Sequence, residues 1–337
     1  MKASRLDLLL LLLSHFWRRI QANMESRKNS GWLMRRLAAL FSEIGFVFRI
    51  VVIHPLSTLI EITTIVGCRN LCVACPQAVF VNSYVSKPNR PKAMSFDDFK
   101  KLVDAHDRNT CILFGGYSEP FAHPQCVEMV EYALRKCWVG MNTTLVGLSP
   151  EGYDRFRDHP KFCYLFLHLP DADGMTKISM DEEYLAILGH VIKHKPRYAM
   201  LLSHLHAARE HPKISHIISC ADSPLIYTGL HDRAGNVKLD HPDIVVRKEP
   251  VTGALSCSLL FLDAFKKGSG HVLPDGTTVI CTCDWSIEAV IGNGFVETVP
   301  AMRSSSAYQV IQSACRDPNN VDVICRKCFW AAPQRTS

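Results

Sequence analysis

Three cysteines fall within eight residues, in the segment Cys68-Arg-Asn-Leu-Cys72-Val-Ala-Cys75. The spacing C-x3-C-x2-C on one loop lets three thiolates bind three corners of a cubane iron–sulfur cluster. The fourth iron then has no protein ligand and can accept a chelating substrate or cofactor. A structural zinc ion is the alternative, but it needs a fourth ligand, for which Cys111 is distant in sequence and His54 lies upstream.

A glycine-rich segment, Phe114-Gly115-Gly116-Tyr117-Ser118-Glu119-Pro120, follows the next predicted strand after this loop. Glycines permit close approach of a ligand to the backbone, and a carboxylate suits an ammonium group. Alone, Gly-Gly-x-x-Glu indicates no more than a turn. Because it comes one strand–helix unit after C-x3-C-x2-C, it predicts a ligand-binding turn beside the cysteines.

A second group of cysteines lies after residue 250: Cys257, Cys281, Cys283, Cys315, Cys325 and Cys328. The C-x2-C pair at 325 and 328 suits either an iron–sulfur cluster or a zinc ribbon. The tail around these residues has few apolar runs, so we expect a metal centre to hold it together. The five other cysteines, at positions 111, 126, 137, 163 and 220, are interpreted as buried small apolar residues.

The elements that must position these motifs alternate from about residue 57. Strands are predicted at Leu59–Val66, Cys111–Phe114, Val139–Val146, Cys163–Leu169, Tyr198–His204 and Leu225–Leu230. Helices are predicted at Ser95–Asp107, Val127–Cys137, just after Pro150, Asp181–Lys193 and Ile214–Cys220. This order predicts an α/β fold with a parallel sheet curled into a full or partial barrel, its site at the C-terminal strand edges. His271–Cys281 predicts a hairpin with Pro-Asp-Gly as its turn.

The two N-terminal motifs resemble those of the radical S-adenosylmethionine (SAM) superfamily. The resemblance implies a partial (β/α)6 TIM-like barrel that holds a [4Fe–4S] cluster on Cys68, Cys72 and Cys75. SAM would bind the open iron, and a reductant such as flavodoxin or ferredoxin would supply an electron. Reductive cleavage would release methionine and a 5′-deoxyadenosyl radical, which abstracts a substrate hydrogen. Ala74 departs from the family, which usually has an aromatic residue at this position.

The same resemblance implies where SAM is bound. Gly115, Gly116 and Glu119 would receive the amino group of its methionine end, and Ser203 is another expected contact. His168 is the only polar side chain available for the ribose on the fourth strand. Both His168 and Ser203 also suit an ordinary structural role at a strand end.

The C-terminal cysteines resemble the auxiliary-cluster extension of radical SAM enzymes, called SPASM when it holds two clusters and twitch when it holds one. Gly276 precedes Cys281 by five residues, as in that extension. The resemblance implies one [4Fe–4S] cluster on Cys257, Cys281, Cys325 and Cys328. In this interpretation Cys283 could replace Cys281 or Cys257, and Cys315 is a spare.

Three regions are expected: a basic amphipathic arm at 1–54, a barrel at 55–240 and an auxiliary-cluster domain at 241–337. The arm contains nine basic and three acidic residues, which accounts for the whole net charge of +6. The electroneutral remainder excludes a large nucleic-acid-binding face. The arm either docks as a helix on the barrel or rests on an anionic membrane or a protein partner.

We expect a cytoplasmic location, because the apolar run Leu8–Leu13 abuts Asp7 and is followed by no signal-peptide cleavage site. The expected function is that of a radical SAM oxidoreductase acting on a carbohydrate-like or other small metabolite. A maturase that modifies a ribosomal peptide or a protein is the alternative. A non-catalytic iron–sulfur or zinc protein is the alternative from another class. No catalytic side chain is assigned; Asp284 is a possible proton relay or simply a solvated acid.

Overall fold

The computed structural model describes residues 57–207, 209–219, 225–227, 230–237, 244–247, 249–257, 268–320 and 322–333. The predicted arm at 1–54 and Cys220 lie outside these residues. The strands of the first half are β1 (Thr58–Ile62), β2 (Thr110–Phe114), β3 (Trp138–Thr143), β4 (Phe162–His168), β5 (Met200–Leu205) and β6 (Leu225–Tyr227). The helices are α3 (Gln77–Val85), α4 (Phe96–Ala105), η2 (Pro120–Ala122), α5 (Cys126–Leu134), α6 (Pro150–Asp154), α7 (Glu182–Lys193) and α8 (Pro212–Ser219).

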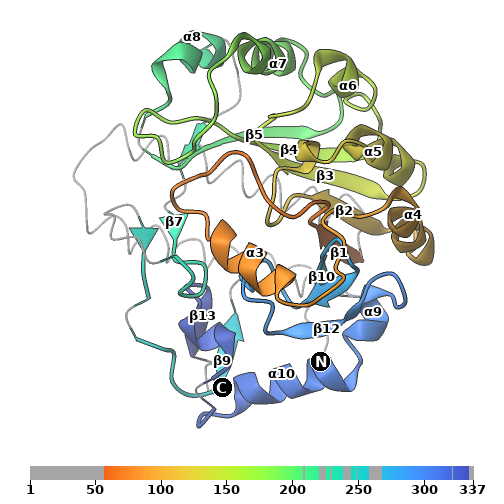
Figure 1. Cartoon of the computed structure of the whole chain (residues 1–337), viewed down its shortest axis with the longest axis vertical. Helices are drawn as coiled ribbons and strands as arrows, with labels where there is room; N and C mark the ends of the chain where they lie inside the picture. The colour runs from red at the N-terminus through yellow and green to blue at the C-terminus, as the bar shows by residue number, and fades with distance from the viewer. Residues whose placement is uncertain are drawn as a thin grey trace, which may run out of the picture.

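A nine-stranded sheet organises the molecule, in the order β12-β11-β10-β1-β2-β3-β4-β5-β6. Strands β1 to β6 are all parallel to one another. Helices α4 to α8 follow one face of this sheet around its curve (Figure 1). The predicted α/β class, with a mostly parallel sheet in a partial barrel, is confirmed.

Local sequence accounts for the start of each helix and for the two faces of each strand. Ser95 and Asp181 cap α4 and α7 by accepting hydrogen bonds from backbone N–H groups of the first turn. In β1, Ile60 and Ile62 are fully buried in the core beneath the helices. Glu61 alternates with them and therefore lies on the opposite face, toward the barrel interior.

Strand β1 is shorter than predicted, because it ends at Ile62 instead of Val66. The next residue, Thr63, uses its hydroxyl to accept a hydrogen bond from Tyr117 N at 3.0 Å. The chain then leaves the sheet and enters the cysteine loop. Sequence periodicity cannot predict where the chain leaves the sheet, since Thr63 and Val66 have as high a β propensity as the residues of the strand itself.

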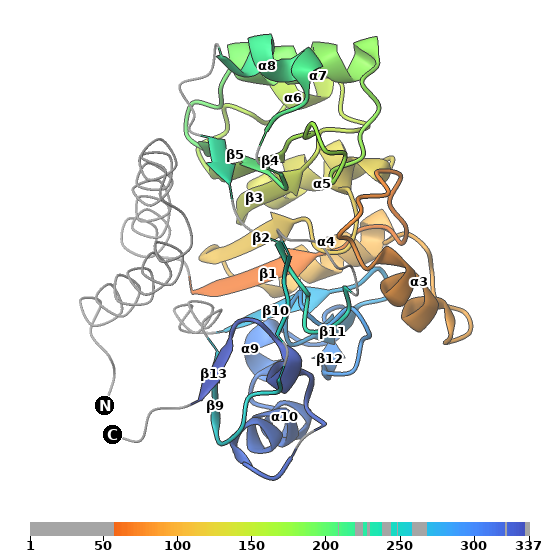
Figure 2. The ribbon, with the colours of Figure 1, turned by 90° about the vertical axis from the view of Figure 1, so that its left-hand side faces the viewer.

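The C-terminal residues continue the barrel sheet. Their elements are β7 (Leu230–His231), β8 (Ile244–Val245), β9 (Leu255–Cys257), β10 (Ser269–Val272), β11 (Thr277–Val279), β12 (Val290–Asn293), α9 (Val299–Met302), α10 (Ser306–Arg316), η4 (Ile324–Lys327) and β13 (Ala331–Pro333). The predicted hairpin is β10–β11, and β10 pairs in parallel with β1. The sheet thus crosses the expected boundary at residue 240, while β9, β13 and α10 lie together beyond it (Figure 2).

Among the described residues, no helix combines the length and apolarity needed to cross a membrane.

Candidate active site

The cysteine loop leaves the C-terminal end of β1 and carries Cys68, Cys72 and Cys75 as half-buried free thiols. Burial is the main cause that raises the pKa of Cys72 to about 12 and that of Cys75 to about 11, and the charge of Cys68 contributes to both values. The three sulfurs are therefore within electrostatic reach of one another. Thiols with raised pKa values need a metal to become thiolates at neutral pH.

Backbone N–H groups are directed at these sulfurs. Asn70 and Glu119 donate to Cys68, and Lys177 donates to Cys72. Such donors favour the thiolate and stabilise a bound cluster. The donor set of this loop fits the three protein ligands of an iron–sulfur cluster.

A second loop, after β4, supports the cysteine loop from the side. Val73 N donates to Met175 O at 2.9 Å, which ties the two loops together. The carboxylate of Asp171 is buried and accepts hydrogen bonds from the backbone N–H groups of Met175, at 2.8 Å, and Thr176, at 2.7 Å. These bonds hold the second loop in shape.

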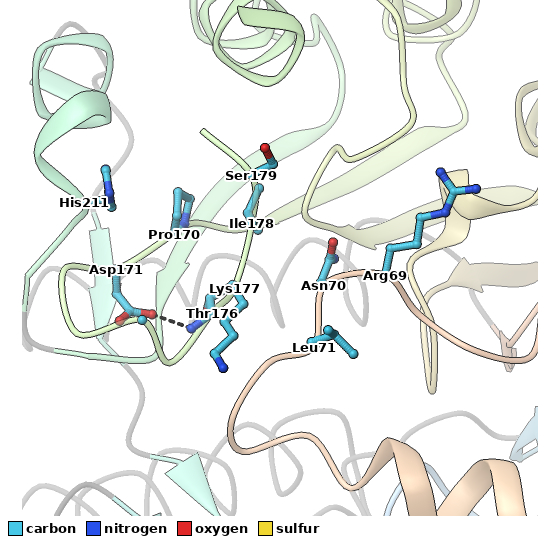
Figure 3. Close-up of a pocket in the computed structure, with 11 residues that line it drawn as sticks. Arg69, Asn70, Leu71, Pro170, Asp171, Thr176, Lys177, Ile178, Ser179 and His211 are labelled. Atoms are coloured by element: carbon cyan, nitrogen blue, oxygen red, sulfur yellow. Dashed lines mark hydrogen bonds between the residues drawn. The ribbon is translucent and has the colours of Figure 1, made fainter. Parts of the chain in front are cut away.

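A cavity of about 360 Å³ opens between the two loops (Figure 3). Arg69, Asn70 and Leu71 line it on the cysteine side, and residues of the loop after β4 line it on the other. Leu71 is 72% exposed. The cavity therefore places an apolar, accessible side chain directly beside Cys72.

The glycine-rich turn packs against the C-terminal hairpin. Gly116 has φ +78°, and a Cβ there would lie 2.3 Å from His271 Cε1 and 2.6 Å from Thr63 Oγ1. Only glycine fits this position. His271 Nε2 contacts Thr63 Oγ1 at 2.7 Å, and its ring stacks on that of Tyr117 with centroids 4.3 Å apart. The turn is thereby fixed by the strand that extends the barrel sheet.

Glu119 is buried and makes four hydrogen bonds. Its Oε1 accepts from Thr143 Oγ1 at 2.5 Å and from Phe121 N at 3.3 Å. Its Oε2 accepts from the backbone N–H and the hydroxyl of Thr144, at 2.7 and 2.6 Å. Burial raises the pKa of this carboxyl, and the same donors partly offset the rise. Glu119 thus holds the loop after β3, and its contact with a SAM ammonium stays a prediction.

Glu61 and Arg233 are site residues that the sequence analysis missed. The Glu61 residue is half-buried, but its carboxyl group lies in the barrel interior, where burial raises its pKa to about 7. The charge of Arg233 and the Gly116 N–H oppose this rise. Arg233 also acts electrostatically on Cys75 and His168, so its cation lies between the cysteine loop and β4. An acid within an otherwise apolar strand is the signal that could have identified Glu61.

The register of β4 and β5 separates two predicted SAM contacts. Leu167 is opposite Ser203, and His168 is opposite His204. Leu167 lies in the core beneath the helices, so Ser203 faces the helices as well. His168 faces the barrel interior, where Arg233 acts on it. The role of Ser203 in SAM binding stays a prediction that this register does not favour.

The C-terminal cysteines form one connected group: Cys257, Cys281, Cys283, Cys315, Cys325 and Cys328. Cys283 hydrogen-bonds to Cys281 and Cys328, and Cys315 hydrogen-bonds to Cys325. Cys257 and Cys281 act electrostatically on Cys325. The four predicted ligands are thus brought together. Cys283 and Cys315, considered from the sequence as a substitute and a spare, lie among them.

Two arginines hold the backbone around this group. Arg326 is 1% exposed and donates to the carbonyl oxygens of Val251, Gly253, Asp317 and Asn320. Arg247 donates to those of Cys328, Phe329 and Ala331. The neighbouring thiol of Cys325 has the largest effect in lowering the pKa of Cys315, and Arg326 adds to it. In the same way Cys283, and to a smaller extent Arg247, lower the pKa of Cys328. This basic surrounding suits an anionic iron–sulfur centre.

Asp284 has a structural role in this arrangement. Its carboxylate is fully buried and accepts from Glu288 N at 2.9 Å and Ala289 N at 2.7 Å. Its carbonyl oxygen accepts from the Tyr117 hydroxyl at 2.8 Å. Burial raises its pKa to about 6. It is therefore an internal cap of the segment after Cys283 and not a solvated acid.

No protein-family model and no curated protein matches the chain. Solved structures do. The anSMEcpe structure with bound AdoMet and Kp18Cys peptide has a TM-score of 0.51 and 11% identity over 81% of this chain and 86% of that chain. BtrN in complex with AdoMet and 2-DOIA has a TM-score of 0.48 and 14% identity over 81% and 93%. Streptococcus suis SuiB bound to S-adenosylmethionine has a TM-score of 0.43 and 11% identity over 98% and 89%. The chain has the fold of radical SAM enzymes.

Proposed function

We propose that this chain is a radical SAM enzyme with a [4Fe–4S] cluster on Cys68, Cys72 and Cys75. The observation that carries the proposal is the loop itself, where three thiols with N–H donors directed at them adjoin the Gly116 turn. Held on these cysteines, a cluster would supply one-electron reduction of SAM, with flavodoxin or ferredoxin as the electron source; C–S cleavage and hydrogen abstraction would then yield methionine and 5′-deoxyadenosine.

The proposed substrate is a carbohydrate-like or other small polar metabolite, which is oxidised or rearranged. Glu61, Arg233 and His168 supply charged and polar groups to the barrel interior, and these suit hydroxyl or carboxylate groups of a small molecule. A peptide or protein side chain is the second candidate substrate. The similar fold of anSMEcpe, whose structure contains a bound peptide, favours it.

A second [4Fe–4S] cluster in the C-terminal group belongs to the proposal, with Cys257, Cys281, Cys325 and Cys328 as its ligands. It would accept the electron left on a substrate radical and so make net oxidation possible. The Arg326 and Arg247 cations beside these cysteines support an anionic cluster there. A zinc ion is the alternative occupant.

Anaerobic reconstitution followed by incubation with SAM and dithionite tests the proposal. We expect 5′-deoxyadenosine from the native chain and none from the Cys68→Ala/Cys72→Ala/Cys75→Ala variant. Cys163→Ala, which alters a buried cysteine outside both groups, is the matched control. Intact clusters without SAM cleavage would overturn the enzyme assignment in favour of an electron carrier.

Iron counting tests the second centre. About eight irons per chain indicate two cubanes, whereas about four irons with one zinc indicate a zinc site.

Substrate class is tested with deuterium-labelled cell extract divided into a small-molecule and a peptide fraction. Deuterium in 5′-deoxyadenosine from the peptide fraction alone would overturn the small-metabolite proposal.

A cytoplasmic location, with the arm at 1–54 on a membrane or a protein partner, completes the proposal. The nine basic residues of this arm suit a membrane that contains anionic lipid. Flotation of the full chain with anionic vesicles, but not with neutral vesicles, is the expected result. Equal flotation with both would contradict it.

A further inference from the structure

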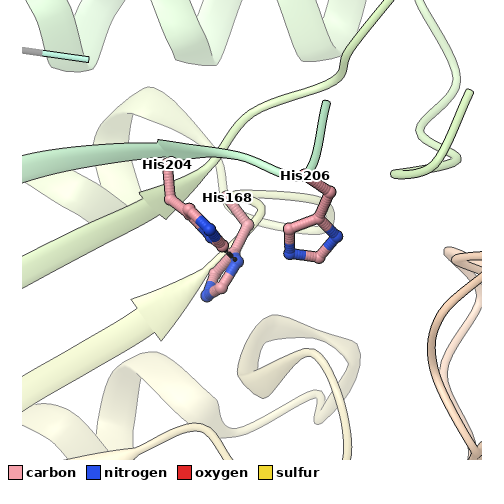
Figure 4. Close-up of side chains that lie close together, drawn as sticks. All are labelled: His168, His204 and His206. Carbon is pink, nitrogen blue, oxygen red and sulfur yellow. Dashed lines mark hydrogen bonds between the residues drawn. The ribbon is translucent and has the colours of Figure 1, made fainter. Parts of the chain in front are cut away.

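Three histidines meet at the C-terminal ends of β4 and β5. His168 ends β4, His204 lies opposite it on β5, and His206 follows on the same face. One ring nitrogen from each lies within 4.8 Å of the others (Figure 4). The proposed function uses His168 only as a polar group toward SAM or the substrate, and it assigns no role to His204 or His206.

The hydrogen bonding of the His206 ring sets it apart from the rings of His168 and His204. His204 Nδ1 and His168 Nδ1 are 3.2 Å apart, so one ring hydrogen-bonds to the other. Both ring nitrogens of His206 are buried, and no hydrogen-bond partner is present among the described residues. Leaving a buried polar atom unpaired is unfavourable, so this side chain calls for a ligand.

We propose that His168, His204 and His206 bind one divalent transition-metal ion, with Zn²⁺ as the representative. A tetrahedral ion with Zn–N bonds of about 2.0–2.1 Å has ligand nitrogens about 3.3–3.4 Å apart, close to the His168–His204 spacing. Three imidazoles form a nitrogen donor set suited to zinc, cobalt, nickel or iron.

Two of the histidines, His168 and His206, are in the protonation state that a metal requires. Burial lowers the pKa of His168 to about 4 and lowers that of His206 well below its usual range. The imidazoles of His168 and His206 are therefore neutral at pH 7, with nitrogen lone pairs available. C-terminal strand ends in a barrel are also where metal and substrate sites are usually built.

Arg233 determines what else the metal binds. Its cation acts on His168 and His206, so a second cation at this site needs an anion beside it. Three protein ligands leave an open position, which an anionic oxygen would fill between the metal and Arg233. The source of that oxygen, a substrate carboxylate or alkoxide, rests on the proposed function; the metal site does not.

The test uses the cluster-reconstituted full chain, dialysed anaerobically against Zn²⁺ and then desalted. We expect about one bound zinc per chain, lost in His206→Ala and in His168→Ala without change in iron content. His211→Gln is the matched control, because His211 is a nearby histidine outside the triad. In the described part of the chain, its ring accepts a hydrogen bond from the backbone N–H of Lys213. Zinc-edge X-ray absorption should show nitrogen and oxygen neighbours near 2.0 Å.

A sulfur shell near 2.3 Å would place the zinc on cysteines and overturn the proposal. So would equal zinc loss in His211→Gln, or no zinc bound to the native chain. If the triad variants also lose iron, the absorption spectrum of the native chain decides alone. SAM cleavage is not part of this readout, so failure of the proposed enzyme activity is distinguishable from failure of the metal site.

Discussion

Thr144 binds Glu119 twice: its backbone N–H and its hydroxyl both donate to Oε2, at 2.7 and 2.6 Å. This pairing joins the turn after β2 to the loop after β3, and Asn70 in the cysteine loop in turn donates to Thr144 Oγ1 at 2.7 Å. One buried carboxylate thus connects three loops at the C-terminal edge of the sheet. The geometry of the cysteine loop therefore depends on residues of two other loops, Glu119 and Thr144.

Replacement of Glu119 by Gln should lower the free energy of unfolding by about 2–4 kcal/mol, because an amide NH₂ then faces donors that need an acceptor. Urea unfolding under anaerobic conditions measures the change. Glu297→Gln is the control, since Glu297 is exposed and should shift stability by less than about 0.5 kcal/mol. Equal effects of the two variants would contradict the role assigned to Glu119.

Replacement of Gly116 by Ala should be strongly destabilising, by more than about 2 kcal/mol, because the new Cβ meets both His271 and Thr63. Gly174→Ala separates the two causes. Gly174 has φ +68° with open space around it, so its variant suffers backbone strain alone, about 1 kcal/mol. Thermal unfolding of both variants gives the comparison. A similar shift in the two would show that the hairpin yields to the added methyl group.

Glu61 should make stability depend on pH. Its pKa is about 7 in the folded chain and near 4.5 when unfolded, so between these values the folded chain holds the extra proton. The free energy of unfolding then falls as pH rises from 4.5 to 7, by up to about 1.4 kcal/mol per unit. Glu61→Gln should remove this slope. Parallel pH profiles of melting temperature in the native and variant chains would refute it.

Replacement of Arg326 by Ala should unfold the C-terminal segment locally, since four backbone carbonyl groups lose their donor. A loss of about 3 kcal/mol or more is expected, because a hydrogen bond to a charged group contributes about 1.5–3 kcal/mol. Limited proteolysis should cut the variant near the residues that Arg326 holds, within 249–257 or 317–333, while the nine-stranded sheet stays intact. Arg316→Ala, at an exposed position on α10, is the control and should resist proteolysis like the native chain.

Cys315 distinguishes two ligand sets in the C-terminal group. If Cys257, Cys281, Cys325 and Cys328 are the ligands, Cys315→Ala keeps the iron content, and Cys325→Ala loses about four irons. Iron analysis after reconstitution measures both. Loss of iron in Cys315→Ala would make Cys315 a ligand, as its hydrogen bond to Cys325 permits.

Local chemistry made much of this protein predictable. Ser95 and Asp181 start helices because their side chains accept from the first turn, wherever the helix lies in the fold. The C-x3-C-x2-C spacing brings three thiols onto one loop, because residues so near in sequence cannot separate. The parallel α/β sheet was predictable for the same reason, because strand and helix segments alternate along the chain and each is indicated by its own residues.

Contacts between distant residues were decided only by the tertiary structure. His271 lies 208 positions from Thr63, yet β10 pairs with β1 and brings the two side chains into contact beside Gly116. The Glu61–Arg233 interaction and the histidine triad likewise depend on strand register, which sets the face of every side chain. A sequence shows which groups are available; the pairing of the strands determines which of them meet.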